Sequence, residues 1–304
     1  MYEDYKEYLG PARPCLICGD DYGATERSVW AKEEYFIAVK CDKCGMVTVD
    51  PGLTPEGLNV YYSNNIQRRF DDDKKMKDRE IQYIQDKEFL EKFISHGKVL
   101  DVGCNGGFFL SKLSNKFEKF GLEIDKDAVK YAHKFFPSFD IRREWIGEDS
   151  FVKESFDLII FRGVIEHMYD PKSALMRATE LLKPNGKIFF CATPNLDSFC
   201  ADLYREKWNL WHPIQHINIF SINTLHRLMG RDRYGVMATD YPYLETPYEN
   251  QVNDYEKIKE DILIESQGKW EVVEKSPPFW GNMMSVIFQK NIDYKGCLNT
   301  SSIW

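Results

Sequence analysis

The chain has 304 residues, and its hydrophobic share of 43% and aromatic share of 14% exclude a disordered protein. Its length allows one large domain or two smaller ones. The formal net charge is −8, which disfavours binding to nucleic-acid backbones. The densest basic run, residues 67–77, is interleaved with aspartates and predicts a solvated helical surface, so we expect no nucleic-acid partner.

The first residues are acidic and lack the apolar core of a secretory signal. No run approaches the roughly 18 apolar residues that a membrane span requires. We therefore expect a cytoplasmic protein. In a reducing compartment its eight cysteines favour metal or redox chemistry over disulfides.

Two Cys-x-x-Cys-Gly motifs lie near the start of the chain and contain Cys15, Cys18, Cys41 and Cys44. Each motif brings two thiolates onto one tight turn, and four thiolates suit tetrahedral Zn²⁺. Residues 28–31 and 35–40 between the motifs read as short strands, which predicts a zinc ribbon over residues 1–52. A redox dithiol would leave the second motif unexplained. A closed four-thiolate site has no open coordination position, so we expect the zinc to be structural.

The next segment, residues 53–96, is expected to be a helical linker, because its apolar residues from Met76 to Ile94 recur with a helical period. From residue 97 to 200, strands and helices alternate. Strands are predicted at 99–102, 120–123, 156–161 and 187–192. Helices are predicted at 107–116, from the N-cap Asp125 to before Pro137, and at 171–182, followed by a turn at 185–186. This order predicts a parallel sheet with helices on both faces.

The C-terminal part, residues 201–304, is less regular. Helices are predicted at 221–229 and 254–266, and a late buried strand at 283–289, which would help to complete the sheet and a substrate pocket. The stretch 241–278 is rich in Tyr and Pro and is expected to shape the pocket or an interface.

The apolar run Val99–Val102 ends in a glycine turn at Gly103, Gly106 and Gly107, and Glu123 closes the next apolar run. This layout is typical of a nucleoside-cofactor crevice at the carboxyl ends of parallel strands. A dinucleotide site would have glycines at 103, 105 and 108, but Asn105 stands at the middle position. A carboxylate at position 123 can accept hydrogen bonds from both ribose hydroxyls of either cofactor class.

The segments 99–109, 121–125, 156–167 and 181–190 resemble, in order and spacing, the motifs of class I S-adenosylmethionine-dependent methyltransferases. The resemblance is dense over residues 97–195 and weaker to residue 290. It implies a Rossmann-like, doubly wound, mostly parallel seven-stranded sheet. The cysteine motifs resemble the N-terminal zinc-binding domain of a subset of these enzymes. That subset often occurs with sugar, surface-glycan and small-metabolite biosynthesis.

The resemblance also implies roles for individual residues. The methionine part of the cofactor would be lined by Asp101 and the backbone of Gly103, Asn105 and Gly107, and Glu123 would bind the ribose. Adenine would lie near Ile124, Trp145 and Ile146. The transferable methyl group would be bordered by Arg162 and Gly163.

A general base is needed if the methyl acceptor is a hydroxyl or an activated carbon, and histidine has the most suitable pKa. His167 follows the strand at 156–161, at the crevice end of the sheet. His212 and His216 lie in an aromatic-rich loop, and His216–Phe220 matches a His-x-x-x-Phe pattern that in the resembling enzymes commonly covers the acceptor pocket. These three histidines are the candidate bases, although ordering of a loop and ordinary aromatic packing remain alternatives.

We therefore expect an enzyme that transfers a methyl group to a small molecule, such as a sugar, a nucleotide-linked sugar or a related metabolite. The alternatives are an RNA methyltransferase, a non-catalytic cofactor-binding scaffold and an NAD-dependent sugar oxidoreductase. The last is disfavoured by the imperfect glycine motif and by the lack of a Tyr-x-x-x-Lys pair. The acceptor, the type of bond formed and the oligomeric state are left open.

Overall fold

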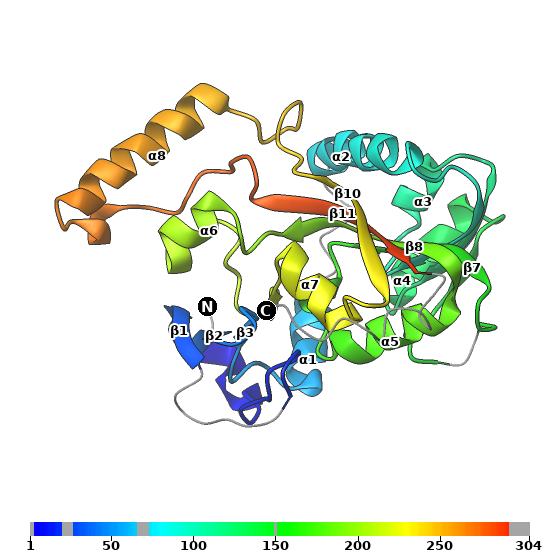
Figure 1. Cartoon of the computed structure of the whole chain (residues 1–304), viewed down its shortest axis with the longest axis horizontal. Helices are drawn as coiled ribbons and strands as arrows, with labels where there is room; N and C mark the ends of the chain where they lie inside the picture. The colour runs from blue at the N-terminus through cyan, green and yellow to red at the C-terminus, as the bar shows by residue number, and fades with distance from the viewer. Residues whose placement is uncertain (1–2, 20–26, 66–72, 149–150, 292–304) are drawn as a thin grey trace.

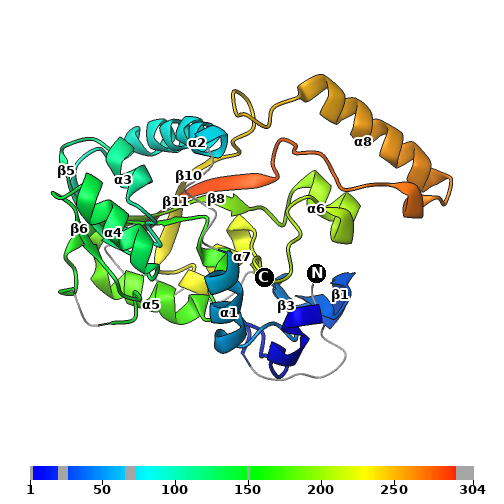
Figure 2. The same ribbon diagram turned by 180° about the vertical axis from the view of Figure 1, so that it is seen from behind.

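The computed structural model describes residues 3–19, 27–65, 73–148 and 151–291, arranged around two sheets. In Figures 1 and 2 the N-terminal elements and helix α8 (Gln251–Ser266) lie on one side of the molecule, away from α4 (Lys126–Phe135) and β6 (Asp140–Arg142). Part of the predicted basic surface, residues 66–72, lies outside the described residues. No described helix is both long enough and apolar enough to span a bilayer.

The larger sheet has seven strands in the order β10-β11-β8-β7-β4-β5-β6. Its parallel part contains β6, β5 (Phe117–Leu122), β4 (Gly97–Val102), β7 (Phe156–Arg162) and β8 (Leu182–Pro194). The antiparallel strand β11 (Met283–Lys290) lies between β8 and β10 (Tyr234–Asp240). The predicted mostly parallel, seven-stranded sheet is confirmed. Strand β10 was not predicted because this edge strand has only one fully buried residue, Tyr234, and therefore no apolar run.

Both faces of this sheet are covered by helices, as the alternation along β7 requires. Leu158 and Ile160 pack in one core cluster with α2 (Asp73–Glu91), α3 (Phe108–Lys112) and α4. Ile159 and Phe161 pack in another with α5 (Pro171–Leu181) and α7 (Ile222–Met229). A doubly wound sheet of this kind leaves the carboxyl ends of its central strands open for a ligand.

Two helix starts follow the expected chemistry. The side chain of Asp125 accepts hydrogen bonds from the backbone N–H groups of Asp127 and Ala128, and Ser221 caps α7 in a capping box with Thr224. Two helix ends were predicted wrongly. α3 ends at Lys112 because the next residue is extended. α2 ends at Glu91 because residues 93 and 94 both donate to the carbonyl of Leu90 and form a turn.

The predicted turn at residues 185–186 lies inside β8, where the pairing with β7 shifts between Phe156↔Leu182 and Leu158↔Lys187. Asn185 has a φ of +63°, so it adopts the left-handed conformation of a turn. The turn is therefore real, but it forms an irregularity within a strand and not the connection between a helix and a strand.

The smaller sheet is antiparallel and has the order β1-β2-β3-β9. Strands β1 (Arg27–Glu33) and β2 (Phe36–Cys41) confirm the two strands predicted between the cysteine motifs, and β3 (Val47–Val49) follows them. The fourth strand, β9 (Asn218–Ile219), comes from far along the chain and pairs with β3 through Val47↔Ile219 and Thr48↔Asn218. The N-terminal module therefore shares its sheet with the segment that follows the seven-stranded core.

A separate hydrophobic core joins these parts. Trp30 of β1 makes edge-to-face contacts with Trp208 and Trp211, with ring centroids 6.3 and 5.9 Å apart, and both partners are fully buried. This core also contains residues of α1 (Pro55–Asn65), α6 (Phe199–Tyr204) and α8. The remaining elements are short 3-10 helices: η1 (Glu3–Tyr8), η3 (Ile165–His167), η4 (Arg205–Lys207) and η5 (Trp270–Val272).

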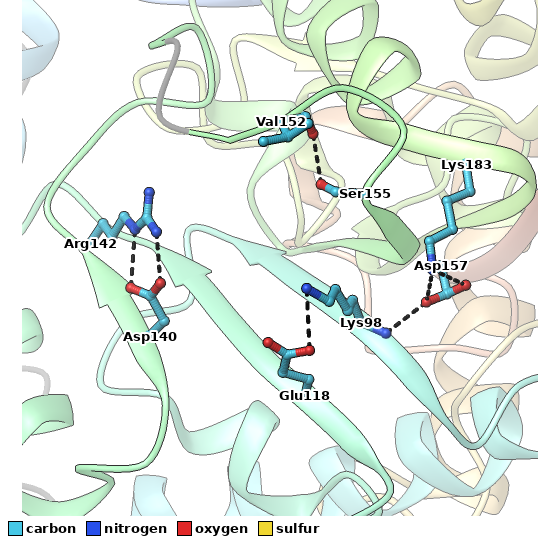
Figure 3. A network of polar contacts seen from close by, with 8 residues as sticks. All are labelled: Lys98, Glu118, Asp140, Arg142, Val152, Ser155, Asp157 and Lys183. Atoms are coloured by element: carbon cyan, nitrogen blue, oxygen red, sulfur yellow. Dashed lines mark hydrogen bonds and ion pairs between the residues drawn. The ribbon is translucent and has the colours of Figure 1, made fainter.

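Polar pairs fix the amino ends of the central strands (Figure 3). Asp157 of β7 accepts from the backbone N–H of Lys98 at 2.8 Å and from Lys183 Nζ at 2.8 and 2.9 Å. Lys98 Nζ lies 3.4 Å from the carboxylate of Glu118 on β5. These contacts lie at the end of the sheet opposite to the glycine turn. They hold the strands together at that end and leave the glycine-turn end for a ligand.

Candidate functional site

A cavity of about 540 Å³ lies at the carboxyl ends of β4, β5 and β7 and is bounded on one side by α1. Most of the predicted cofactor residues line it: Gly103, Asn105, Glu123, Ile124, Trp145, Ile146 and Gly163. His167 lines it as well. The structure thus brings these sequence-predicted residues together around one space of a size that suits a small-molecule ligand.

The backbone of the glycine turn lines this cavity at Gly103 and Asn105. Gly103 has a φ of +74°, and a Cβ added there would lie 2.5 Å from Cγ2 of Val164, so a side chain at 103 is excluded on two grounds. Asn105 has a φ of +51°, the left-handed conformation expected for asparagine at a position where glycine is usual.

Glu123 is held rigidly at the end of β5. Its Oε2 accepts from the backbone N–H of Asn105 at 2.8 Å. Its Oε1 accepts from the N–H groups of Ile124 and Asp125 at 2.7 and 2.9 Å. The carboxylate therefore joins the glycine turn to the end of the neighbouring strand and faces the cavity in a fixed orientation.

Two predicted residues lie beside the cavity without lining it. Asp101 is buried, its Oδ1 accepts no hydrogen bond from the described residues, and burial raises its pKa to about 8. Gly107 caps α3 with a φ of +78°, and a Cβ there would lie 3.2 Å from the ring of Phe136. Asp101 is therefore buried close to the turn, and Gly107 allows the start of α3 to pack closely against Phe136.

Arg162 faces a second, smaller cavity of about 310 Å³ and is not among the residues that line the larger one. Its Nε donates to Oδ2 of Asp86 at 2.9 Å, and its guanidinium carbon lies 4.3 Å from the ring centroid of Tyr83. Both partners belong to α2. Sequence reasoning missed Asp86, because a helix so polar gives no signal that one carboxylate on it is buried.

The two cavities adjoin along the backbone after β7, since Arg162 lines the smaller one and Gly163 lines the larger one. Gly163 has a φ of +58°, and a Cβ there would lie 3.4 Å from the carbonyl oxygen of Ala192, which lines the smaller cavity. Consecutive backbone residues after β7 thus line the two spaces.

The candidate bases form a row. We call residues 208–217, which connect η4 to β9, the histidine loop. The ring centroids of His167 and His216 are 5.0 Å apart, and those of His216 and His212 are 5.5 Å apart. His167 Nδ1 bonds to the carbonyl of Gln215 and His216 Nδ1 to that of Leu210, each at 2.7 Å. A carbonyl only accepts, so each Nδ1 carries a proton, which fixes the orientation of both rings.

His167 lines the larger cavity, whereas His216 lies behind it. The histidine loop also lines the smaller cavity, through Asn209 and Leu210. Burial, followed by the neighbouring His167, holds the pKa of His216 well below its ordinary value. Burial and the nearby Lys275 lower the pKa of His212. His216 is therefore neutral at neutral pH.

Glu166 is buried next to His167, and its Oε2 accepts no hydrogen bond from the described residues. Burial raises its pKa to about 8 from 4.5. The folded protein thus holds a proton that the unfolded chain releases, so this residue makes the free energy of unfolding fall as pH rises from 4.5 through 8. In urea titrations, Glu166→Gln is expected to remove this decline, stabilising the protein at pH 9 relative to wild type by on the order of a few kcal/mol. An unchanged difference in stability between pH 5 and pH 9 would contradict this assignment.

The four predicted metal ligands converge. All four thiol sulfurs lie within 4.8 Å of one another, with Cys15–Cys44 and Cys18–Cys41 separations of 3.4 and 3.9 Å. Sulfurs at the corners of a tetrahedron around zinc, each about 2.3 Å from the ion, are about 3.8 Å apart. The donor set and spacing therefore fit one tetrahedral metal ion, and the four cysteines form a candidate metal centre.

Comparison with known proteins identifies the family of the chain. Residues 64–235, more than half of the chain, match the family model described as a methyltransferase domain. The chain belongs to this family. It is a class I S-adenosylmethionine-dependent methyltransferase, as its sequence motifs predicted, and the NAD-dependent alternative is wrong.

The relatives of this methyltransferase share parts of its length. An uncharacterized protein of Methanocaldococcus jannaschii is 32% identical over 153 residues, which cover 49% of this chain and 68% of that protein. The ubiquinone biosynthesis O-methyltransferase of Idiomarina loihiensis is 31% identical over 99 residues, covering 31% of this chain and 41% of that enzyme. The chain thus spans less than half of the length of the ubiquinone enzyme.

Among solved structures, an S-adenosylmethionine-dependent methyltransferase of Thermotoga maritima superposes with a TM-score of 0.50 at 18% identity, covering 77% of this methyltransferase and 98% of that chain. A protein of Pyrococcus horikoshii superposes with a TM-score of 0.51 at 17% identity, covering 76% and 99%. These likenesses show that the fold is shared.

Proposed function

We propose that this methyltransferase transfers a methyl group to a small polar molecule, such as a sugar, a nucleotide-linked sugar or a related metabolite. The observation that carries the proposal is the pair of adjoining cavities on either side of Arg162–Gly163, one lined by Glu123 and the other by residues of α2. One space suits the methyl donor and the other suits an acceptor. The similarity to ubiquinone biosynthesis O-methyltransferases also favours a small-molecule acceptor.

In this proposal the donor occupies the larger cavity. Glu123 binds the ribose hydroxyls, Ile124, Trp145 and Ile146 contact adenine, and Gly103 and Asn105 contact the methionine part. The carboxylate of Glu123 supports this placement, because three backbone N–H groups hold it in a fixed orientation where it lines the cavity. When bound, S-adenosylmethionine supplies a methyl group on a positively charged sulfur.

We propose His167 as the general base, since it lines the larger cavity together with Gly163, the residue that follows Arg162 of the smaller, acceptor cavity. Its fixed Nδ1 proton leaves Nε2 as the atom that takes the proton from the acceptor hydroxyl. His216 then acts as a positioning residue, because its ring packs on His167 and its low pKa prevents a competing positive charge. The main contribution of the protein is alignment of donor and acceptor, which can supply roughly 7–11 kcal/mol.

The four cysteines are proposed to hold one structural Zn²⁺ in a module of residues 1–52, followed by the linker 53–96, the cofactor-binding core 97–200 and the C-terminal part 201–304. The chemistry of four thiolates supports zinc. Because β3 pairs with β9, the module and the C-terminal part share one sheet, so these two units are not structurally independent.

The test is calorimetric titration with S-adenosylhomocysteine and with NAD, followed by a screen of hexoses and nucleotide-linked hexoses with labelled S-adenosylmethionine. We expect binding of S-adenosylhomocysteine alone and label transfer to at least one hydroxylated acceptor. An RNA methyltransferase would instead transfer label to RNA and show salt-sensitive RNA binding. Binding without transfer to any acceptor would favour a scaffold.

Glu123→Gln is expected to weaken S-adenosylhomocysteine binding by about 10- to 150-fold, since hydrogen bonds to a charged group are worth about 1.5–3 kcal/mol. The matched control is Glu118→Gln, which changes an exposed carboxylate on β5, the strand that ends just before Glu123, and should leave the affinity unchanged. Calorimetry on both variants, with thermal melts to check folding, measures the difference. Equal affinities in the two variants would remove Glu123 from the binding site.

A further inference from the structure

The smaller cavity has walls from at least five parts of the chain that are distant in sequence. Gln85 and Asp86 come from α2, Arg162 from the end of β7, Asn209 from the histidine loop, and Asn282 from the segment before β11. The segment between β10 and α8 supplies Tyr243 and Tyr248. No single stretch of sequence signals such a site.

Two amide side chains in this cavity have fixed orientations. Nδ2 of Asn282 donates to Oδ1 of Asn209 at 3.2 Å and to the carbonyl of Pro277 at 3.3 Å. Nε2 of Gln85 donates to the carbonyl of Leu244 at 3.1 Å. Because a carbonyl oxygen can only accept, the NH₂ group of each amide must face the protein.

The carbonyl oxygens of these two amides have no partner among the described residues. Oδ1 of Asn282 and Oε1 of Gln85 are both buried and accept no hydrogen bond from the residues that the structure describes. Asn282 is only 3% exposed. Leaving such acceptors unsatisfied costs about 1–3 kcal/mol each, so each of these two oxygens favours a hydrogen-bond donor from a ligand or water.

The cavity has no uncompensated charge. Its only charged lining residues within the described chain are Arg162 and Asp86, and they form an ion pair with a closest N–O distance of 2.8 Å. An anionic group there would find its only cation already paired. The remaining lining is largely apolar and aromatic, and includes Tyr243, Tyr248 and Phe279, which suits the C–H faces of a ring.

We infer that the smaller cavity is a binding site for a neutral, polyhydroxylated ring, whose hydroxyls donate to Asn282 and Gln85. Its volume of about 310 Å³ is at the lower end of the range for small-molecule sites and is sufficient for one ring. That this ring is the methyl acceptor rests on the proposed function. Any charged part of the acceptor must remain outside the cavity.

The test uses myo-inositol and methyl α-D-glucoside as probes, and cyclohexanol as a ring with a single donor. Saturation-transfer NMR titrations are run on the full chain with and without S-adenosylhomocysteine. We expect at least one polyol to bind at least tenfold more tightly than cyclohexanol. Asn282→Leu and Gln85→Leu should each weaken polyol binding at least tenfold and leave S-adenosylhomocysteine affinity unchanged.

The matched control is Asn59→Leu, the same substitution at an exposed asparagine in the larger cavity, which should leave polyol binding unchanged. Gln85 is half-buried on a helix, so its variant serves if Asn282→Leu does not fold. Failure of both polyols to bind, or polyol binding that Gln85→Leu does not change, overturns the inference. Failure of S-adenosylhomocysteine to bind contradicts the proposed function instead, since the polyol titration is also run without it.

Discussion

Replacement of Cys44 by serine is expected to remove the metal ion and, with it, the order of the histidine loop. Structural zinc contributes roughly 10–16 kcal/mol of apparent binding free energy in isolated zinc-finger peptides, comparable with the whole stability of a typical domain. Cys44 is followed closely by β3, which pairs with β9, and Asn218 of β9 donates to the carbonyl of Met168 at 2.7 Å. The effect should therefore reach the residue next to His167.

Metal analysis and hydrogen exchange test this prediction. We expect the metal content to fall from one equivalent to near zero, with exchange accelerating in residues 36–49 and 215–220 while β4 and β7 stay protected. Methyl transfer should be lost although S-adenosylhomocysteine still binds, because Gly103 and Glu123 directly follow β4 and β5 of the larger sheet. The control is Asp42→Asn, an exposed change between Cys41 and Cys44. Protection of β2 and β3 that survives metal loss would contradict the prediction.

His167→Ala is expected to lower kcat by about 10²- to 10⁴-fold, the usual contribution of a general base, with S-adenosylhomocysteine affinity changed little. His216→Ala should cost less, since His216 contacts His167 and does not line the cavity. His133→Ala is a matched control, because His133 also bonds to a backbone carbonyl, at 2.8 Å from that of Ile141, but lies on α4.

The pH profile separates the two roles. His216 is neutral at neutral pH because burial, and then His167, lower its pKa. Its removal should therefore leave the acidic limb of the kcat/KM profile in place, whereas removal of His167 should abolish that limb. If the limb lies far below pH 6.5 and disappears in His216→Ala instead, His216 is the base.

Much of the fold could be predicted because its signals are local. The apolar run of β7, the N-cap at Asp125 and the two cysteine motifs each depend on neighbouring residues, and the structure confirms the strand, the helix start and the converging thiols. The larger cavity could be predicted for a related reason, since parallel strands bring their carboxyl ends to one edge of a sheet.

Features that depend on distant pairing could not be predicted. Strand β9 has two residues and exists only because β3 offers an edge to it. The partner of Arg162 is 76 residues away on α2, so the placement of this side chain in the smaller cavity depends on how that helix docks. The smaller cavity itself joins at least five such segments, and no spacing along the chain marks it.

The pairing of β3 with β9 bears on how this enzyme can be re-engineered. A hybrid that received its cysteine-rich module from another protein would need the matching two-residue strand as well, because otherwise β3 would expose unpaired N–H and C=O groups as a template for aggregation. The module therefore cannot be transferred to another protein on its own. Successful grafts should exchange it together with residues 208–220, as one unit encoded in two pieces.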